Sequence, residues 1–498
     1  MTTFETIFND PNLPQTKSQR PGDRPKQEGG ALRLEGSAAK AAFLINGNSY
    51  FAELARVLRQ ARRTVWIIGW DFNPDIRMQP EKSDETLADL LHALAAANPK
   101  LEIRILIWTL GPIYSEKSLQ VLRKKNFPRN ARIDLRFELQ PTLRGCHHQK
   151  LVCIDDAVAF IGGIDLTSRR WDTRRHRAEE KLRRDPEGVS YDPLHDVQAM
   201  VTGDAARLIG DIARQRWENA TGEIHLPLAE NIRFVWPDDL AISMREVAVS
   251  FALTEPSTAL RPGISDGIAM TLDVIARARR QLYIEAQYLA SFRVADAIAA
   301  RLQEEDGPEV VIICTRSSHG LIEKLVMGGN RDRVIRRLKR ADRAGRLRVY
   351  YAVTPGEDGE VEVLVHSKLI IADDELVRIG SSNLNNRSEG LDCECDMLFE
   401  AGNDEHRGAI ADLGNRLLSE YLGTKPESFA AAFAQSGSVI AAVDALNDGP
   451  RGLREFTVAL SGSISPITGT GLFDPVRPFA PLDRLGLGAL VRLLIRPA

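Results

Sequence analysis

Apolar residues at helical spacing alternate with short, continuous apolar runs along most of the chain. Apolar positions three and four residues apart predict helices, and runs of four to eight apolar residues predict buried strands. The first series of such segments predicts helices over 47–61 and 85–97, and strands over 64–70, 101–108 and 132–139. Helices that alternate with strands favour a mixed or mainly parallel sheet with helices on its faces.

A second series of the same kind follows later in the chain. It predicts helices over 267–280, 293–304 and 328–345, and strands over 281–289, 309–315 and 346–353. Two similar series in a chain of 498 residues indicate two similar halves, because this length is too great for one ordinary domain.

Each series ends in a related motif. The first motif is HHQKLVCIDDAVAFIGGIDL from His147, and the second is VHSKLIIADDELVRIGSSNL from Val365. Counted from His148 and His366, both motifs place lysine at +2, aspartate at +7 and glycine at +14. Agreement at every one of these offsets indicates a duplication within the chain.

Strand periodicity groups the polar residues of each motif. Residues two apart in a strand point to the same side, so His148 shares a face with Lys150, and His366 with Lys368. Halves that meet about a pseudo-twofold axis would bring these four side chains into one site.

Two histidines and two lysines in one site are suited to cleavage of a phosphodiester. Lysines neutralise the phosphate oxygens, one imidazole attacks phosphorus and the other exchanges a proton with the leaving oxygen. This chemistry requires no metal and no other cofactor.

The remaining motif residues have expected structural or binding roles. Asp155 and Asp373 follow the apolar strands and are expected to bond turn backbone. Gly163 and Ser381 follow the return strands, where small residues allow the backbone to approach a ligand closely.

Composition narrows the class of protein. A formal charge of −3 argues against a dedicated nucleic-acid binder, so no nucleic-acid partner is expected. The five cysteines favour a reducing compartment over a disulfide framework or a zinc site. No apolar run is long enough to predict a membrane span.

Residues 1–38 are rich in proline, glycine and charge and are expected to form a disordered tail. They lack the apolar core of a secretory signal. The expected location is therefore cytoplasmic, with peripheral membrane association, and export by a route that needs no such signal stays open.

The paired motifs resemble those of the phospholipase D superfamily, over about residues 39–400. GWDFNP, LHDVQAMVTG and YIEAQY extend the resemblance, and the first motif is similar to that of eukaryotic-type phospholipases D and their bacterial relatives. The resemblance implies that His148 is the nucleophile and His366 the general acid. The phosphate ligands expected on this basis are Lys150, Lys368 and Asn383. The small-residue loops add Ser381 and Gly163, whose hydroxyl and amide donors are expected at the phosphate as well.

The resemblance also places an acidic residue of each half behind the histidine of the other half. Asp196 is expected behind His366, and Glu394 behind His148. Asp165 stands where the superfamily usually has asparagine. An ionised aspartate cannot donate to a phosphate, so Asp165 is expected to be structural.

The implied fold is α/β: two similar halves, each a mixed sheet flanked by helices, packed about a pseudo-twofold axis around one active site. The expected divisions are a tail over 1–38, halves over 39–230 and 231–425, and a helical segment and tail over 426–498. A monomer is expected because both motifs lie in one chain.

The expected reaction is hydrolysis of phosphatidylcholine or phosphatidylethanolamine through a phosphohistidine, with transfer to alcohols. The alternatives are a cardiolipin synthase-like phosphatidyltransferase, a nuclease or another phosphodiesterase. A non-enzymatic alternative, an anionic-lipid binding module, is disfavoured by the intact histidines and lysines of both motifs.

Two basic segments each have two interpretations. The arginines between 169 and 177 either meet anionic headgroups or form a solvated loop. The segment 481–498 is either an amphipathic membrane-surface helix or a helix packed on the body.

Overall fold

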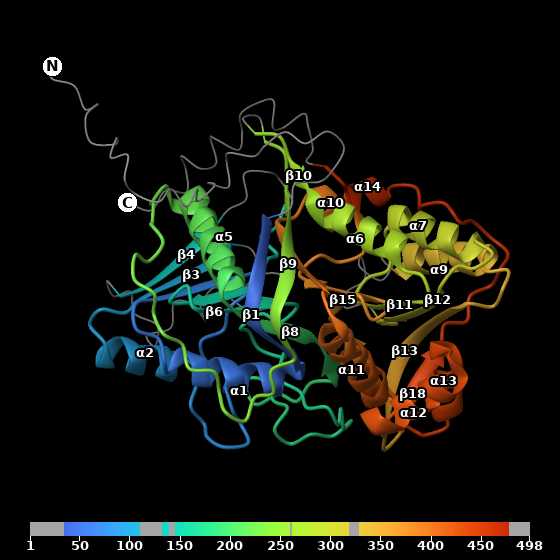
Figure 1. The fold of residues 1–498 in the computed structure, drawn as a ribbon, viewed down its shortest axis with the longest axis horizontal. Coiled ribbons are helices and arrows are strands. Elements are labelled where there is room, and N and C mark those ends of the chain that lie inside the picture. The colour runs from blue at the N-terminus through green and yellow to red at the C-terminus, as the bar shows by residue number, and fades with distance from the viewer. Residues whose placement is uncertain (1–33, 110–131, 139–144, 259–260, 318–327, 478–498) are drawn as a thin grey trace.

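The structure is a computed structural model that describes residues 34–109, 132–138, 145–258, 261–317 and 328–477. Two series of elements lie on either side of a central pair of long strands, β1 and β9 (Figure 1). The N-terminal series is coloured blue to green, and the C-terminal series yellow to red.

The first half builds a mixed sheet. Its strands are β1 (Leu34–Ile45), β2 (Thr64–Gly69), β3 (Glu102–Trp108), β4 (Ile133–Glu138), β5 (Leu151–Ile154), β6 (Val158–Gly162), β7 (Leu194–His195) and β8 (Val197–Thr202). Its described helices are α1 (Asn46–Leu58), α2 (Leu87–Ala97) and α5 (Asp204–Thr221). The strand order is β4-β3-β2-β5-β6-β8-β1, parallel from β4 to β2 and antiparallel beyond β2.

The second half repeats this order as β13-β12-β11-β15-β16-β17-β9. Its strands are β9 (Met244–Glu255), β10 (Ile264–Ser265), β11 (Gln281–Ala286), β12 (Glu309–Cys314), β13 (Leu347–Gly356), β14 (Gly359–Val365), β15 (Lys368–Ala372), β16 (Leu376–Gly380) and β17 (Glu394–Glu400). Its described helices are α6 (Asp266–Arg277), α7 (Phe292–Gln303), α9 (Gly329–Ala341), α10 (Asn386–Gly390) and α11 (Asp404–Tyr421).

The two sheets join through β1 and β9, which pair antiparallel from Leu34↔Phe251 to Ala41↔Met244. The prediction of a mixed α/β fold with helices on its sheets is therefore confirmed. Within the described part of the chain, no helix combines the length and apolar character needed to cross a bilayer.

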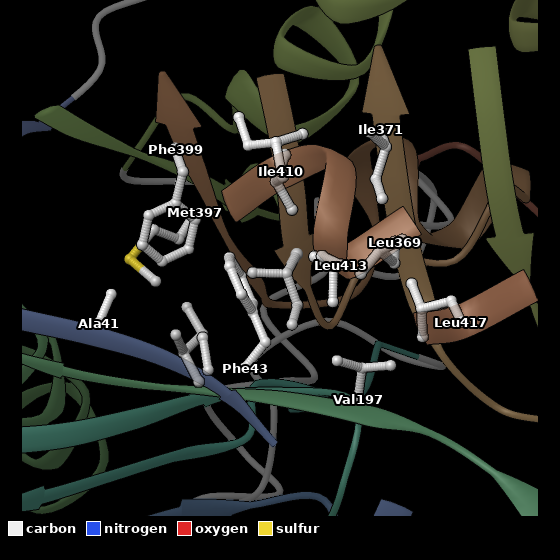
Figure 2. Packing of buried hydrophobic residues seen from close by; sticks show 14 of the residues in the cluster. Ala41, Phe43, Val197, Leu369, Ile371, Met397, Phe399, Ile410, Leu413 and Leu417 are labelled. Atoms are coloured by element: carbon white, nitrogen blue, oxygen red, sulfur yellow. The ribbon is translucent and has the colours of Figure 1, made fainter. Parts of the chain in front are cut away.

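Three apolar cores hold the layers together. The outer cores pack α1 and α2 on the first sheet, and α6, α7 and α9 on the second. The central core contains side chains of both halves together with α5 and α11. Figure 2 shows Ala41 and Phe43 of β1 and Val197 of β8 facing the second half. The labelled residues of that half are Leu369, Ile371, Met397, Phe399, Ile410, Leu413 and Leu417. Burial of this apolar surface favours docking of the halves.

Asp155 and Asp373 occupy equivalent turns, each with a φ of 54°. Aspartate tolerates this left-handed conformation better than most residues. The Asp155 carboxylate accepts hydrogen bonds from the backbone N–H groups of residues 62–64, and that of Asp373 from those of residues 279–281. These donors lead into β2 and β11, so each carboxylate ties its turn to the neighbouring strand.

Some predicted boundaries differ from the structure. Residues 34–38, expected in the disordered tail, form the start of β1. The helical segment expected from residue 426 onward is divided into α12 (Pro426–Ser436) and α13 (Val439–Leu446), because Gly437 has a φ of 67° and ends the first helix. β18 (Gly452–Glu455), expected in a separate C-terminal segment, pairs with β13 of the second half. α14 (Thr470–Phe473) follows it, and the amphipathic segment 481–498 lies outside the described residues.

Candidate active site

Each motif histidine precedes a motif strand and lies against the other half. The backbone N–H of His148 donates to Cys393 O at 2.9 Å, and that of His366 donates to His195 O at 2.8 Å. Equivalent bonds in both directions show that the halves meet pseudo-symmetrically at the two motifs.

A carboxylate of the other half lies behind each imidazole. His148 Nδ1 is 2.9 Å from Glu394 Oε2, and His366 Nδ1 is 2.7 Å from Asp196 Oδ2. These are the crossed pairs that the resemblance implies. Because Nδ1 is occupied in both rings, Nε2 is the nitrogen available for a reaction.

Burial and the neighbouring cations favour neutral imidazoles. Burial lowers the pKa of His148 well below its usual range, and Lys150 and Lys368 lower it further. The pKa of His366 is likewise well below its usual range, through burial first and then through Lys368 and Arg170. A neutral imidazole is the nucleophilic form. An arriving phosphate anion would offset the lysines and favour protonation of the second ring.

The carboxylates are buried as well. Burial raises the pKa of Glu394 to about 7, against the lowering effect of hydrogen bonds from Ser381 and Ser388. Burial also raises the pKa of Asp196, and Lys368 opposes this rise. Burial lowers the pKa of Lys368. The protonation states of these groups therefore depend on one another.

Both lysines are held by a side chain and by a motif carbonyl. Lys150 Nζ lies 3.0 Å from Asp165 Oδ2 and donates to His148 O at 2.9 Å. Asp165 therefore contacts the lysine rather than serving as a phosphate donor. Lys368 Nζ donates to Gln287 Oε1 at 3.0 Å and to the backbone carbonyl of His366. Gln287 lies in the YIEAQY segment, but its local sequence carried no signal for this contact.

Two residues expected to bind phosphate use their donors elsewhere. The Ser381 hydroxyl donates to Glu394 Oε2 at 2.6 Å, and its backbone N–H donates to Cys395 O at 3.1 Å. The Gly163 N–H donates to Val197 O at 3.2 Å. Both residues therefore adjoin the carboxylates behind the imidazoles, and their expected contact with phosphate stays a prediction.

Asn383 and Ser388 complete the loop of the second motif. The backbone N–H of Asn383 donates to Ser388 Oγ at 3.1 Å, and its buried side-chain oxygen has no hydrogen-bond partner among the described residues. Ser388 Oγ donates to Glu394 Oε1 at 2.7 Å. Two hydroxyls thus hold the two oxygens of Glu394. Sequence reasoning missed Ser388, because the first motif offers no equivalent role for comparison.

Gly163→Ala is expected to lower kcat by about 10²-fold, the scale of a 1 Å misplacement in an active site. A β-carbon at Gly163 would lie 2.2 Å from Asp196 Oδ1, so the carboxylate must shift, which disturbs its 2.7 Å contact with His366. The rate of cleavage of a phosphodiester with an alkoxide leaving group measures the loss. Gly408→Ala is the matched control, since a β-carbon there meets nothing within 4 Å. Equal rates for the two variants would contradict this assignment.

The fold and the site define a duplicated α/β protein with one histidine–lysine centre built from both halves. Two family models match the chain. The model described as "Phospholipase D" matches residues 57–259, and the one described as "Cardiolipin synthase, PLD-like domain" matches residues 271–407. The chain belongs to the phospholipase D superfamily.

Curated relatives and a solved structure agree with this membership. Phospholipase D1 of Saccharomyces cerevisiae is 27% identical over 76% of this chain and 28% of its own length. Phospholipase D1 of Schizosaccharomyces pombe is 23% identical over 70% of this chain and 32% of its own length. The chain thus spans about a third or less of these relatives. The structure of phosphatidylserine synthase from Haemophilus influenzae has a similar fold, with a TM-score of 0.53 and 16% identity over 81% of this chain and 94% of that one.

Proposed function

We propose that the protein is a phosphodiesterase of the phospholipase D type that acts on glycerophospholipids. The observation that carries the proposal is the crossed pair of histidine–carboxylate contacts, each beside a motif lysine. A non-enzymatic lipid-binding module would have no use for two imidazoles whose Nδ1 atoms are both held by buried carboxylates.

The first displacement forms a phosphohistidine. His148 Nε2 attacks phosphorus with its electron pair, and the bond to the headgroup oxygen breaks. The protonated His366 gives its proton to that oxygen, while Glu394 stabilises the positive charge that develops on His148. Lys150 and Lys368 offset the charge on the phosphate oxygens.

The second displacement reverses these roles. His366, now neutral, takes a proton from water as the water oxygen attacks phosphorus. The P–N bond breaks and its electron pair returns to His148. The products are phosphatidic acid and the free headgroup. An alcohol can replace water in this step, because the headgroup has already left.

The relatives named phospholipase D support a phospholipid substrate. The second candidate is phosphatidyl transfer to an alcohol-bearing lipid, because the model that matches the second half is described as a cardiolipin synthase domain. Both candidates use the same intermediate and differ in the acceptor.

With vesicles of phosphatidylcholine or phosphatidylethanolamine, ethanol is expected to divert part of the product from phosphatidic acid to phosphatidylethanol. Headgroup release should change little if formation of the intermediate limits the rate. A chiral thiophosphate substrate should react with retention at phosphorus, since two displacements each invert it. Inversion would reject the covalent intermediate, and the absence of headgroup release would reject the proposed substrate class.

The reaction is proposed to take place with a monomer bound peripherally to a membrane surface on the cytoplasmic side, where a phospholipid substrate lies. One chain carries both motifs of the site, which supports a monomer. Sedimentation of the protein with the same vesicles tests the attachment, and recovery of all the protein in the supernatant would reject it.

A further inference from the structure

A chain of buried ionisable side chains lies behind the second motif. His176 Nδ1 is 3.0 Å from Asp172 Oδ2, and His176 Nε2 is 3.0 Å from Glu420 Oε1. The same Glu420 oxygen is 3.1 Å from His195 Nδ1, and His195 Nε2 is 3.1 Å from Glu285 Oε2. The chain of contacts crosses from the first half to α11 and β11 of the second half.

The contacts define the charge of these residues. An ionised carboxylate only accepts hydrogen bonds, so an imidazole between two carboxylates must donate from both nitrogens and carry a positive charge. Burial alone would lower the pKa of His195, but Glu285 and Glu420 outweigh burial and raise it to about 10. Arg183 also pairs with Asp172, at 3.1 Å. The imidazolium of His195 and the guanidinium of Arg183 thus lie among three carboxylates in a buried network.

His176, His195 and Glu420 also have the composition of a metal site. Their contacts favour hydrogen bonds instead. Around a tetrahedral ion with bonds of about 2.0–2.1 Å, ligand atoms lie about 3.3 Å apart. The Glu420 oxygen is closer than this to both ring nitrogens, and it also accepts from Asn46 Nδ2 at 2.7 Å.

The network includes or contacts the residues that adjoin Asp196 and His366 in the sequence. His195 immediately precedes Asp196, and its carbonyl accepts from the backbone N–H of His366. Glu285 Oε2 accepts from the hydroxyl of Ser367, which follows His366, at 2.5 Å. Against the effect of burial, the pKa of Asp196 is lowered first by Lys368, then by the Val197 backbone N–H and by His195.

The other half has no such imidazolium at the equivalent position. There Cys393 precedes Glu394, and its carbonyl accepts from His148 N as His195 O accepts from His366 N. The thiol of Cys393 stays neutral, because burial raises its pKa. The two catalytic histidines therefore have different surroundings, although each contacts a carboxylate and a backbone carbonyl of the other half in the same way.

We propose that His195 is a positioning residue: a buried imidazolium that holds Asp196 ionised and in place, so that His366 is the histidine that serves as the proton donor. The proposal rests on the proposed phosphodiesterase function. It gives a physical reason why the roles of the two motifs differ, since an ionised Asp196 stabilises the protonated form of His366.

The leaving group provides the test. His195→Gln is expected to lower kcat for phosphatidylcholine by about 10- to 100-fold, the scale for loss of an outer hydrogen-bonding partner. KM should change little. The loss should be several-fold smaller for a p-nitrophenyl phosphodiester, because nitrophenolate leaves without a proton. A purely structural defect would lower both rates equally.

His176→Gln is the matched control, because it removes an imidazole from the same network without touching Asp196. For His176→Gln, the ratio of the rate on phosphatidylcholine to the rate on the p-nitrophenyl diester should equal that of the wild type. Thermal melting should show a loss of stability similar to that of His195→Gln. If His195→Gln does not fold, Glu285→Gln replaces it, since it removes one of the two carboxylates that keep His195 charged.

Equal losses of His195→Gln on both substrates would reject the positioning role. A stoichiometric metal ion found by elemental analysis of the purified protein would also reject it, in favour of a metal centre. A wild-type protein that cleaves neither diester would reject the proposed function itself, and this inference with it.

Discussion

The His148→Ala protein is expected to lose about 10⁴-fold or more in headgroup release, the scale seen when a covalent nucleophile is removed. Without the ring, no phosphohistidine forms, and water must attack a phosphodiester directly. Release of choline from phosphatidylcholine vesicles measures the loss. Mass spectrometry of protein quenched during turnover should show a phosphatidyl adduct on the wild type and none on the variant.

His147→Gln is the control for this substitution. His147 is the adjacent histidine, is buried, and its Nδ1 lies 3.1 Å from Glu138 Oε2 rather than at the crossed pairs. It should retain activity within a few-fold. His366→Ala distinguishes the two roles: with a p-nitrophenyl ester it should still form the adduct, which then accumulates. Substantial turnover by His148→Ala would overturn the covalent mechanism.

Glu394→Gln is expected to lower kcat by about 10²- to 10⁴-fold, as loss of the carboxylate behind a catalytic histidine does elsewhere. The amide has nearly the same size but no charge. It cannot stabilise the positive ring that forms when His148 bonds to phosphorus. Binding of vanadate or inorganic phosphate should stay within a few-fold of the wild type, because the lysines remain. Titration calorimetry and headgroup release separate the two effects.

Ser388→Ala provides a graded comparison. It removes one of the two hydroxyls that donate to Glu394 and leaves the carboxylate in place. We expect a loss of about 10-fold, well below that of Glu394→Gln. Unchanged turnover of Glu394→Gln would show that the contact with His148 has no part in the reaction.

The local sequence was sufficient to predict the motif strands and most of the helices that flank them. Strand parity put each lysine on the side of its histidine, and the two motifs form the equivalent hairpins β5–β6 and β15–β16. The duplication indicated that the two motifs meet. Short-range periodicity and repeated offsets carry this information because they reflect which face of an element is buried.

The resemblance, rather than any pattern, singled out Asp196 and Glu394. Their place behind His366 and His148 depends on packing between the halves. The partners are 170 positions apart in one pair and 246 in the other. Local sequence patterns do not predict contacts over such separations.

Only the tertiary structure decided which groups Gly163 and Ser381 contact, and which residues surround the histidine–carboxylate pairs. Gly163 and Ser381 were expected at the phosphate, but their donors are directed to Val197, Cys395 and Glu394. The pairing of β1 with β9, and the His195 network between the halves, were likewise not predictable. Burial without a hydrogen bond is costly for a polar group, so each buried donor bonds to the acceptor that packing places beside it. For these features the acceptor belongs to a distant segment, and it is in place only once the apolar cores have docked.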